Sequence, residues 1–170
     1  MSASGNIKKF VSSFEQDCKE SLLPPEGGLE AIGQPVIPFT IIRGTRGYLE
    51  RITHQINGTY TNGWYDSCAV MLRRLIETLI IEAFEYHNIA QKIKNGSGDF
   101  FFLSDLISAS LSEPSWNLGR NVRKALPKLK DIGDKSAHSR RFNAVRNDID
   151  KILSEIRVVV QEFVYLSGLK

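Results

Sequence analysis

The fold of this chain is decided by one stretch, CAVMLRRLIETLIIEAF at residues 68–84. Its apolar residues recur every three or four positions, which is the spacing of one helix face. That face comprises Cys68, Leu72, Leu75, Ile76, Leu79, Ile80 and Ala83, and Ile81 and Phe84 widen it further. A helix as apolar as this one is expected at the centre of a helical bundle.

The segments on either side of this stretch also carry helical patterns, separated by turn residues. We expect an amphipathic helix over 7–22, a helix over 48–56 that breaks at Asn57-Gly58 and restarts after 61–63, the central helix over 64–87, a shorter helix over 100–111, another over 117–132 with a break or restart at Pro127, and a last helix over 144–166. The predicted fold class is therefore all-α, an antiparallel helical bundle.

Residues 1–47 are expected to form an N-terminal helix and an arm, and residues 48–170 the helical domain. The arm, residues 24–47, is rich in Pro and Gly, which favours irregular backbone. Its β-branched run at 36–42 is consistent with an extended segment, and the prolines there argue against a central strand. We expect this arm to pack across the helical domain or onto a second subunit.

Composition excludes several classes of protein and site. Hydrophobic residues make up 42% and charged residues 24% of the chain, as in an ordinary globular protein. The apolar runs are far shorter than the ~18 residues of a membrane span, and the polar N-terminus lacks the pattern of a secretory signal. A cytoplasmic location without membrane contact is therefore expected. We predict no disulfide between Cys18 and Cys68, no metal site among three separated histidines, and no cofactor.

Positive charge gathers in the second half of the chain. Between Arg120 and Arg146, nine Lys or Arg residues stand against two acids, a net of +7, whereas the whole chain carries +3 and the remainder therefore −4. A basic region of this kind is the expected footprint of a phosphate-bearing ligand such as RNA or a nucleotide. A solvated helix face is an equally good interpretation of the same charges.

One short link inside this basic region looks most like a site. The sequence GDKSAHSRR, at residues 133–141, sets a lone histidine among cations between two predicted helices. His138 could hydrogen-bond a helix end or a carboxylate, contact RNA, or assist proton transfer, because imidazole titrates near neutral pH. Asp134 could cap the turn that begins there.

Two blocks of the sequence resemble the HEPN superfamily and, within it, the restriction-associated DUF4145 branch. They are CAVMLRRLIE at residues 68–77 and IGDKSAH at residues 132–138, and the resemblance covers the chain from about residue 60 onward. It implies a HEPN-like antiparallel bundle of four or five core helices. It also implies a homodimer in which the loop histidines of two subunits face each other.

Active members of that superfamily are metal-independent ribonucleases of toxin, antiviral and CRISPR-linked systems. Their motif is an arginine, a polar residue, three variable positions and a histidine. Laid on this chain, His138 matches the histidine and Asp134 the polar residue, whereas Gly133 stands at the arginine position. Because glycine offers no guanidinium to stabilise the pentavalent phosphate, the resemblance implies a degenerate motif.

A displaced cation is the substitute that the sequence offers for that arginine. The candidates are Lys135, Arg140 and Arg141, which are nearest along the chain, and Arg73 and Arg74 of the central helix. The same five residues are candidate RNA contacts. An arginine of the central helix could instead brace the bundle by pairing with Glu77. Trp116 and Phe142, which flank the basic region, either stack on bases or pack in the core or an interface.

The leading prediction is a HEPN-like binding or regulatory module with a degenerate ribonuclease motif, which contacts RNA or a nucleotide. The resemblance implies that it works in a prokaryotic defence or stress system, with a partner protein from that system. One alternative is an active metal-independent endoribonuclease that uses His138 and Asp134 with a displaced arginine. The other alternative is a purely structural dimerisation domain.

Overall fold

The computed structural model describes residues 11–13 and 34–170, so the helix predicted over 7–22 lies outside the described residues apart from 11–13, which are helical. The described chain is all-α, as predicted, and its helices are α2 (Phe39–Ile42), α3 (Gly47–Thr61), α4 (Tyr65–Tyr86), the 3-10 helix η1 (Ala90–Ile93), α5 (Leu103–Ser112), α6 (Arg120–His138), α7 (Arg146–Asp150) and α8 (Leu153–Leu166). No strand forms in this part of the chain, where one isolated bridge joins Lys94 and Phe100. None of the described helices is long and apolar enough to cross a membrane.

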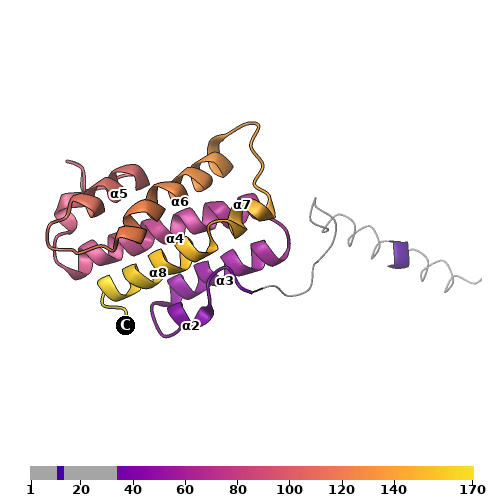
Figure 1. The fold of residues 1–170 in the computed structure, drawn as a ribbon, viewed down its shortest axis with the longest axis horizontal. Coiled ribbons are helices and arrows are strands. Elements are labelled where there is room, and N and C mark those ends of the chain that lie inside the picture. The colour runs from indigo at the N-terminus through magenta and orange to yellow at the C-terminus, as the bar shows by residue number, and fades with distance from the viewer. Residues whose placement is uncertain (1–10, 14–33) are drawn as a thin grey trace, which may run out of the picture.

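Helix α4 lies at the centre of the bundle, as its apolar stretch predicts. Helices α3, α5, α6 and α8 all pack against it, and α6 also packs against α8 (Figure 1). The buried face of α4 includes Leu72, Leu75, Leu79 and Phe84, each at most 1% exposed. Burial of one such side chain contributes about 1.5–3 kcal/mol, so this helix is a main source of the bundle's stability.

The described half of the predicted arm packs on the bundle. Val36 and Ile37 are fully buried, and Phe39–Ile42 form the short helix α2 instead of the extended run that was expected. Asn57 of α3 binds the Ile37 N–H and carbonyl at 3.0 and 2.9 Å. Arg157 of α8 donates to the Val36 carbonyl at 3.1 Å. The segment is therefore fastened to two helices of the bundle.

The predicted break at Asn57-Gly58 is wrong, because α3 runs through both residues. Asn and Gly are weak helix formers, and on their own they favour a turn. Here the Asn57 side chain is occupied by Ile37, and Ile56 and Tyr60 on either side are buried. Tertiary packing therefore overrides the local preference.

The predicted break at Pro127 is also wrong, because α6 continues through it. Proline removes one helical hydrogen bond, but Pro127 lies on the exposed side of α6, where water can satisfy the freed carbonyl. Leu126 and Leu129 beside it are buried and hold the helix in place. The last predicted helix, in contrast, is divided into α7 and α8 at residues 151–152.

The predicted histidine link is helical over most of its length. Helix α6 continues to His138, so only residues 139–141 of the stretch 133–141 lie beyond it. Gly133 is buried against α4, where an added Cβ would lie 2.7 Å from the Arg73 Cβ and 3.2 Å from the Ala69 carbonyl oxygen. Helices α4 and α6 thus touch at a distance that only glycine permits.

Gly133→Ala is expected to lower the free energy of unfolding, although alanine is the better helix former. Helix propensity favours the alanine by about 1 kcal/mol, whereas overpacking costs about 1–3 kcal/mol. We expect a net loss of about 1 kcal/mol, measured by urea unfolding. Gly58→Ala is the matched control, because a Cβ there meets no atom within 4 Å. It should gain up to about 1 kcal/mol, and an equal gain in both variants would contradict the close contact.

Candidate functional site

Arg73 and Asp134 join the two helices that meet at Gly133. The Arg73 Nε donates to Asp134 Oδ1 at 2.8 Å, and Arg73 Nη1 donates to Glu77 Oε2 at 3.3 Å. Lys130 Nζ, one helical turn before Asp134, donates to the second oxygen of the same carboxylate. The expected turn cap at Asp134 is therefore wrong, because the residue lies within α6 and is bound by two cations.

These contacts keep the Asp134 carboxyl charged. Partial burial alone would raise its pKa, but the hydrogen bonds from Lys130 and Arg73 outweigh burial and hold the pKa below its usual value of 3.8. The predicted pairing of an arginine with Glu77 is confirmed for Arg73. Two cations thus face two carboxylates, and the cluster is close to charge balance.

His138 lies one helical turn beyond Asp134, on the same side of α6, and is the last residue of that helix. It is exposed, and it makes no hydrogen bond to any described residue. Neither a helix end nor a carboxylate of the described chain orients the imidazole. The ring is open to a ligand from solvent.

The remaining predicted cations lie on different surfaces. Lys135 pairs with Asp131 at 2.7 Å on the exposed side of α6. Arg74 lines a pocket between α3 and α4, and Arg140 and Arg141 lie in the link between α6 and α7. All three arginines are exposed and make no ion pair with the described residues. Their guanidinium groups are therefore available to an anionic ligand.

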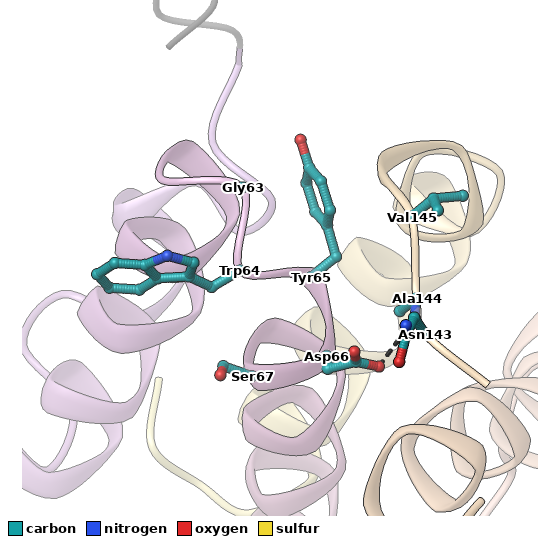
Figure 2. A pocket seen from close by; sticks show the side chains of 8 residues that line it. All are labelled: Gly63, Trp64, Tyr65, Asp66, Ser67, Asn143, Ala144 and Val145. Carbon is teal, nitrogen blue, oxygen red and sulfur yellow. Dashed lines mark hydrogen bonds between the residues drawn. The ribbon is translucent and has the colours of Figure 1, made fainter. Parts of the chain in front are cut away.

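A pocket of about 540 Å³ opens where α4 begins, beside the link between α6 and α7. Figure 2 shows Trp64 and Tyr65 at the start of α4, with the segment Asn143–Val145 across from Tyr65. The Ala144 N–H donates to Asp66 Oδ1 at 2.9 Å, which holds this segment against α4. Trp64 is 42% exposed. In Figure 2 the Tyr65 side chain stands between the Asn143–Val145 backbone and the Trp64 indole, which points away from that backbone, so the accessible indole lies at the side of the pocket remote from this wall.

The wall continues into α7, which is fastened to the end of α3. The Tyr60 hydroxyl donates to Asp150 Oδ1, and Arg146 Nε lies 3.4 Å from Asp150 Oδ2. Burial and the bond to Asp150 raise the pKa of Tyr60 to about 12, so its hydroxyl remains a donor at neutral pH. The start of α4, the end of α3 and α7 therefore meet at one end of the bundle (Figure 1).

Trp64 is the site residue that the sequence prediction missed. An aromatic residue directly after the turn at 61–63 marks a helix start, but this pattern does not indicate whether the ring is exposed. Trp116, one of the two aromatics considered for base stacking, is only 4% exposed and packs on Phe84 at 4.4 Å between ring centroids. Phe142 is half-buried against the core. Of these three aromatic residues, Trp64 is therefore the one whose ring is exposed.

No metal-ligand cluster of His, Cys, Asp or Glu occurs within residues 11–13 and 34–170. Cys68 is fully buried, and burial raises the pKa of its thiol to about 12, so the thiol stays protonated. Cys18 lies outside the described residues. Among the residues considered for the site, those left accessible are the unpaired Arg74, Arg140 and Arg141, the His138 imidazole and the Trp64 indole.

Asp134→Asn should destabilise the protein at neutral pH and have little effect in acid. Because the pKa of Asp134 is lowered in the folded state, its ion pairs stabilise the fold above pH ~4, the value for an unfolded chain. That contribution is lost as the pH falls through the lower folded value. We expect a loss of about 1–2 kcal/mol at pH 7 and almost none in acid, measured by urea unfolding across pH.

The control for this substitution is Asp131→Asn, which removes the exposed partner of Lys135 on the same helix. It should change the free energy of unfolding by less than about 0.5 kcal/mol. If the difference between wild type and Asp134→Asn is the same at every pH, the ion pairs of Asp134 do not stabilise the fold.

The chain matches no family model, no curated protein and no solved structure.

Proposed function

We propose that this chain is a HEPN-like module that binds single-stranded RNA and does not cleave it. One observation carries the proposal: at one pocket, the exposed Trp64 lies on one side of Tyr65, and the wall on the other side, Asn143–Val145, begins two residues after the unpaired Arg140 and Arg141. Aromatic rings and guanidinium groups are the groups with which proteins hold unpaired bases and their phosphates.

The exposed indole favours a single strand over a duplex. Bases in a duplex already stack on one another, whereas an unpaired base can stack on an aromatic side chain. The pocket, about 540 Å³, lies within the size range of pockets that hold one small ligand. One base or nucleotide therefore fits beside Trp64, and the backbone phosphates next to it can reach the basic link.

The charges around His138 favour binding over cleavage. Cleavage by attack of a 2′-hydroxyl needs a guanidinium or similar cation to stabilise the pentavalent phosphate. At Gly133, the position of the motif arginine, α4 leaves no room for a side chain. The nearest arginine on α4, Arg73, is already bound to Asp134 and Glu77, which neutralise its charge. The motif position on α6 and the arginine of α4 that lies beside it therefore supply no free guanidinium for cleavage at His138.

The assembly and the cellular setting are part of the same proposal. The resemblance suggests a homodimer, and His138, exposed at the end of α6, is accessible to a second subunit. The prokaryotic defence or stress system and its partner protein rest on the resemblance alone and remain predictions.

Binding of a fluorescent single-stranded oligoribonucleotide, followed by anisotropy, tests the proposal. The affinity should fall with salt, and Arg140→Ala with Arg141→Ala should reduce the slope of log K against log salt by roughly 1.4, because each phosphate contact contributes about 0.7. Trp64→Ala should weaken binding roughly 5- to 150-fold without changing that slope, because a stacked base contributes about 1–3 kcal/mol.

Two matched controls are available at the other end of the molecule. Arg120→Ala with Lys124→Ala removes the same charge near the start of α6, and Phe102→Ala removes an aromatic residue that is 80% exposed. Neither should change the affinity as strongly as its counterpart. RNA binding that is insensitive to salt, or that weakens equally in the control variants, would overturn the proposed surface.

Incubation of single-stranded RNA with the purified protein in the presence of a chelator distinguishes binding from cleavage. Wild type and His138→Ala should show the same background of cleaved product, because Gly133 replaces the motif arginine and the adjacent Arg73 is bound to Asp134 and Glu77. Cleavage that disappears in His138→Ala would reject the binding module in favour of the endoribonuclease alternative.

A further inference from the structure

A second polar pocket lies between α3 and α4, away from the start of α4. It has a volume of about 300 Å³ and is lined by Tyr48, Arg51, Ile52 and Gln55 of α3 and by Arg74 and Thr78 of α4. Arg74 is nine positions after Tyr65, a distance of roughly 14 Å along the axis of α4. The pocket is therefore distinct from the one beside Trp64.

Two guanidinium groups in this pocket have no counter-ion among the described residues. Arg51 and Arg74 are both exposed, and neither makes an ion pair or a side-chain hydrogen bond with a described residue. Like charges that line one pocket repel each other, and a bound anion would relieve that repulsion.

The neighbouring carboxylates do not supply this anion. Glu77 is bound to Arg73, and Glu82 is bound to Arg46 and to the Tyr48 hydroxyl. Glu50, next to Arg51, accepts the Gly44 N–H at 2.8 Å. The acidic side chains closest to the pocket along α3 and α4 are thus engaged elsewhere, and the charge of the pocket remains positive.

The free donors of the pocket fit an oxyanion with several acceptor oxygens. Each guanidinium presents a planar set of N–H groups that can bind phosphate oxygens bidentately. The Gln55 side-chain amide, which has no partner within the described chain, adds two further N–H donors. The Thr78 hydroxyl donates to the Arg74 carbonyl at 2.8 Å, so it lines the pocket without adding negative charge.

We propose that the pocket between α3 and α4 binds a phosphoryl group through Arg51, Arg74 and Gln55. The phosphoryl group belongs either to a free nucleotide or phosphate ion or to the terminus of an RNA strand. The site does not depend on RNA binding beside Trp64, since its donors come from different turns of α3 and α4.

Isothermal titration with inorganic phosphate and with adenosine 5′-monophosphate, at constant ionic strength, tests the site directly. Arg51→Gln and Arg74→Gln should each weaken binding about 10- to 100-fold, because each loses hydrogen bonds between charged groups. Both side chains are exposed, so the fold should tolerate the substitutions. Arg120→Gln, which removes an exposed arginine at the start of α6, should leave the affinity unchanged.

A second comparison identifies the source of the phosphoryl group. If the ligand is an RNA terminus, an oligoribonucleotide with a 5′-phosphate should bind about tenfold more tightly than its 5′-hydroxyl counterpart, and Arg51→Gln should abolish that difference. If the ligand is a free nucleotide, the monophosphate should bind while the two RNAs bind equally. Either pattern supports the phosphoryl site.

Failure of this site can be told apart from failure of RNA binding beside Trp64. Trp64→Ala should weaken RNA binding and leave the titrations with phosphate and the monophosphate unchanged. The phosphoryl site is overturned if neither of these probes binds below about 10 mM, or if Arg51→Gln and Arg74→Gln bind them as tightly as wild type.

Discussion

The contact between α4 and α6 at Gly133 is the constraint on which the rest of this structure depends. The absence of a side chain at this position lets α6 lie directly on Arg73 and Ala69. The close approach brings Asp134 within 2.8 Å of Arg73 and directs the end of α6 toward the start of α4. There the following link reaches Asp66 through the Ala144 N–H. A wider helix pair would lose the ion pairs, the position of His138 and the wall of the pocket beside Trp64.

Some cations of the basic region are held in ion pairs within the fold, and the others remain accessible to a ligand. Within it, Lys128, Lys130, Lys135 and Arg146 are each paired with a carboxylate, and Arg123 donates to two backbone carbonyls. Two of these pairs use acids outside the region, Glu155 and Asp150, which lowers its net charge from +7 to +5. Near the pocket beside Trp64 the unpaired cations are Arg140 and Arg141, so the proposed recognition of RNA rests on a short link and not on the whole length of α6.

The central helix is predicted well from the sequence because its apolar stripe depends only on the spacing of residues within α4. Helix ends and breaks are harder, since Gly58, Pro127 and Gly133 all carry local signals for a turn and all lie inside helices. Each is kept helical by buried neighbours that only the folded chain brings together. Part of the candidate site could also be predicted: the pairing of an arginine with Glu77 follows from helical spacing. The pairing of Arg73 with Asp134 and the exposure of Trp64 could not, because they depend on packing between segments far apart in sequence.

The bond from Arg157 to the Val36 carbonyl has a consequence for the order in which the chain matures. The two residues are 121 positions apart, so at about 5–20 residues per second the ribosome delivers the donor roughly 6 to 25 s after its acceptor. Throughout that interval α3 can hold the segment through Asn57, but α8, the second helix that binds it, is missing. Complete docking of this segment, which binds Asn57 of α3 as well as Arg157, is therefore possible only after α8 has been synthesised.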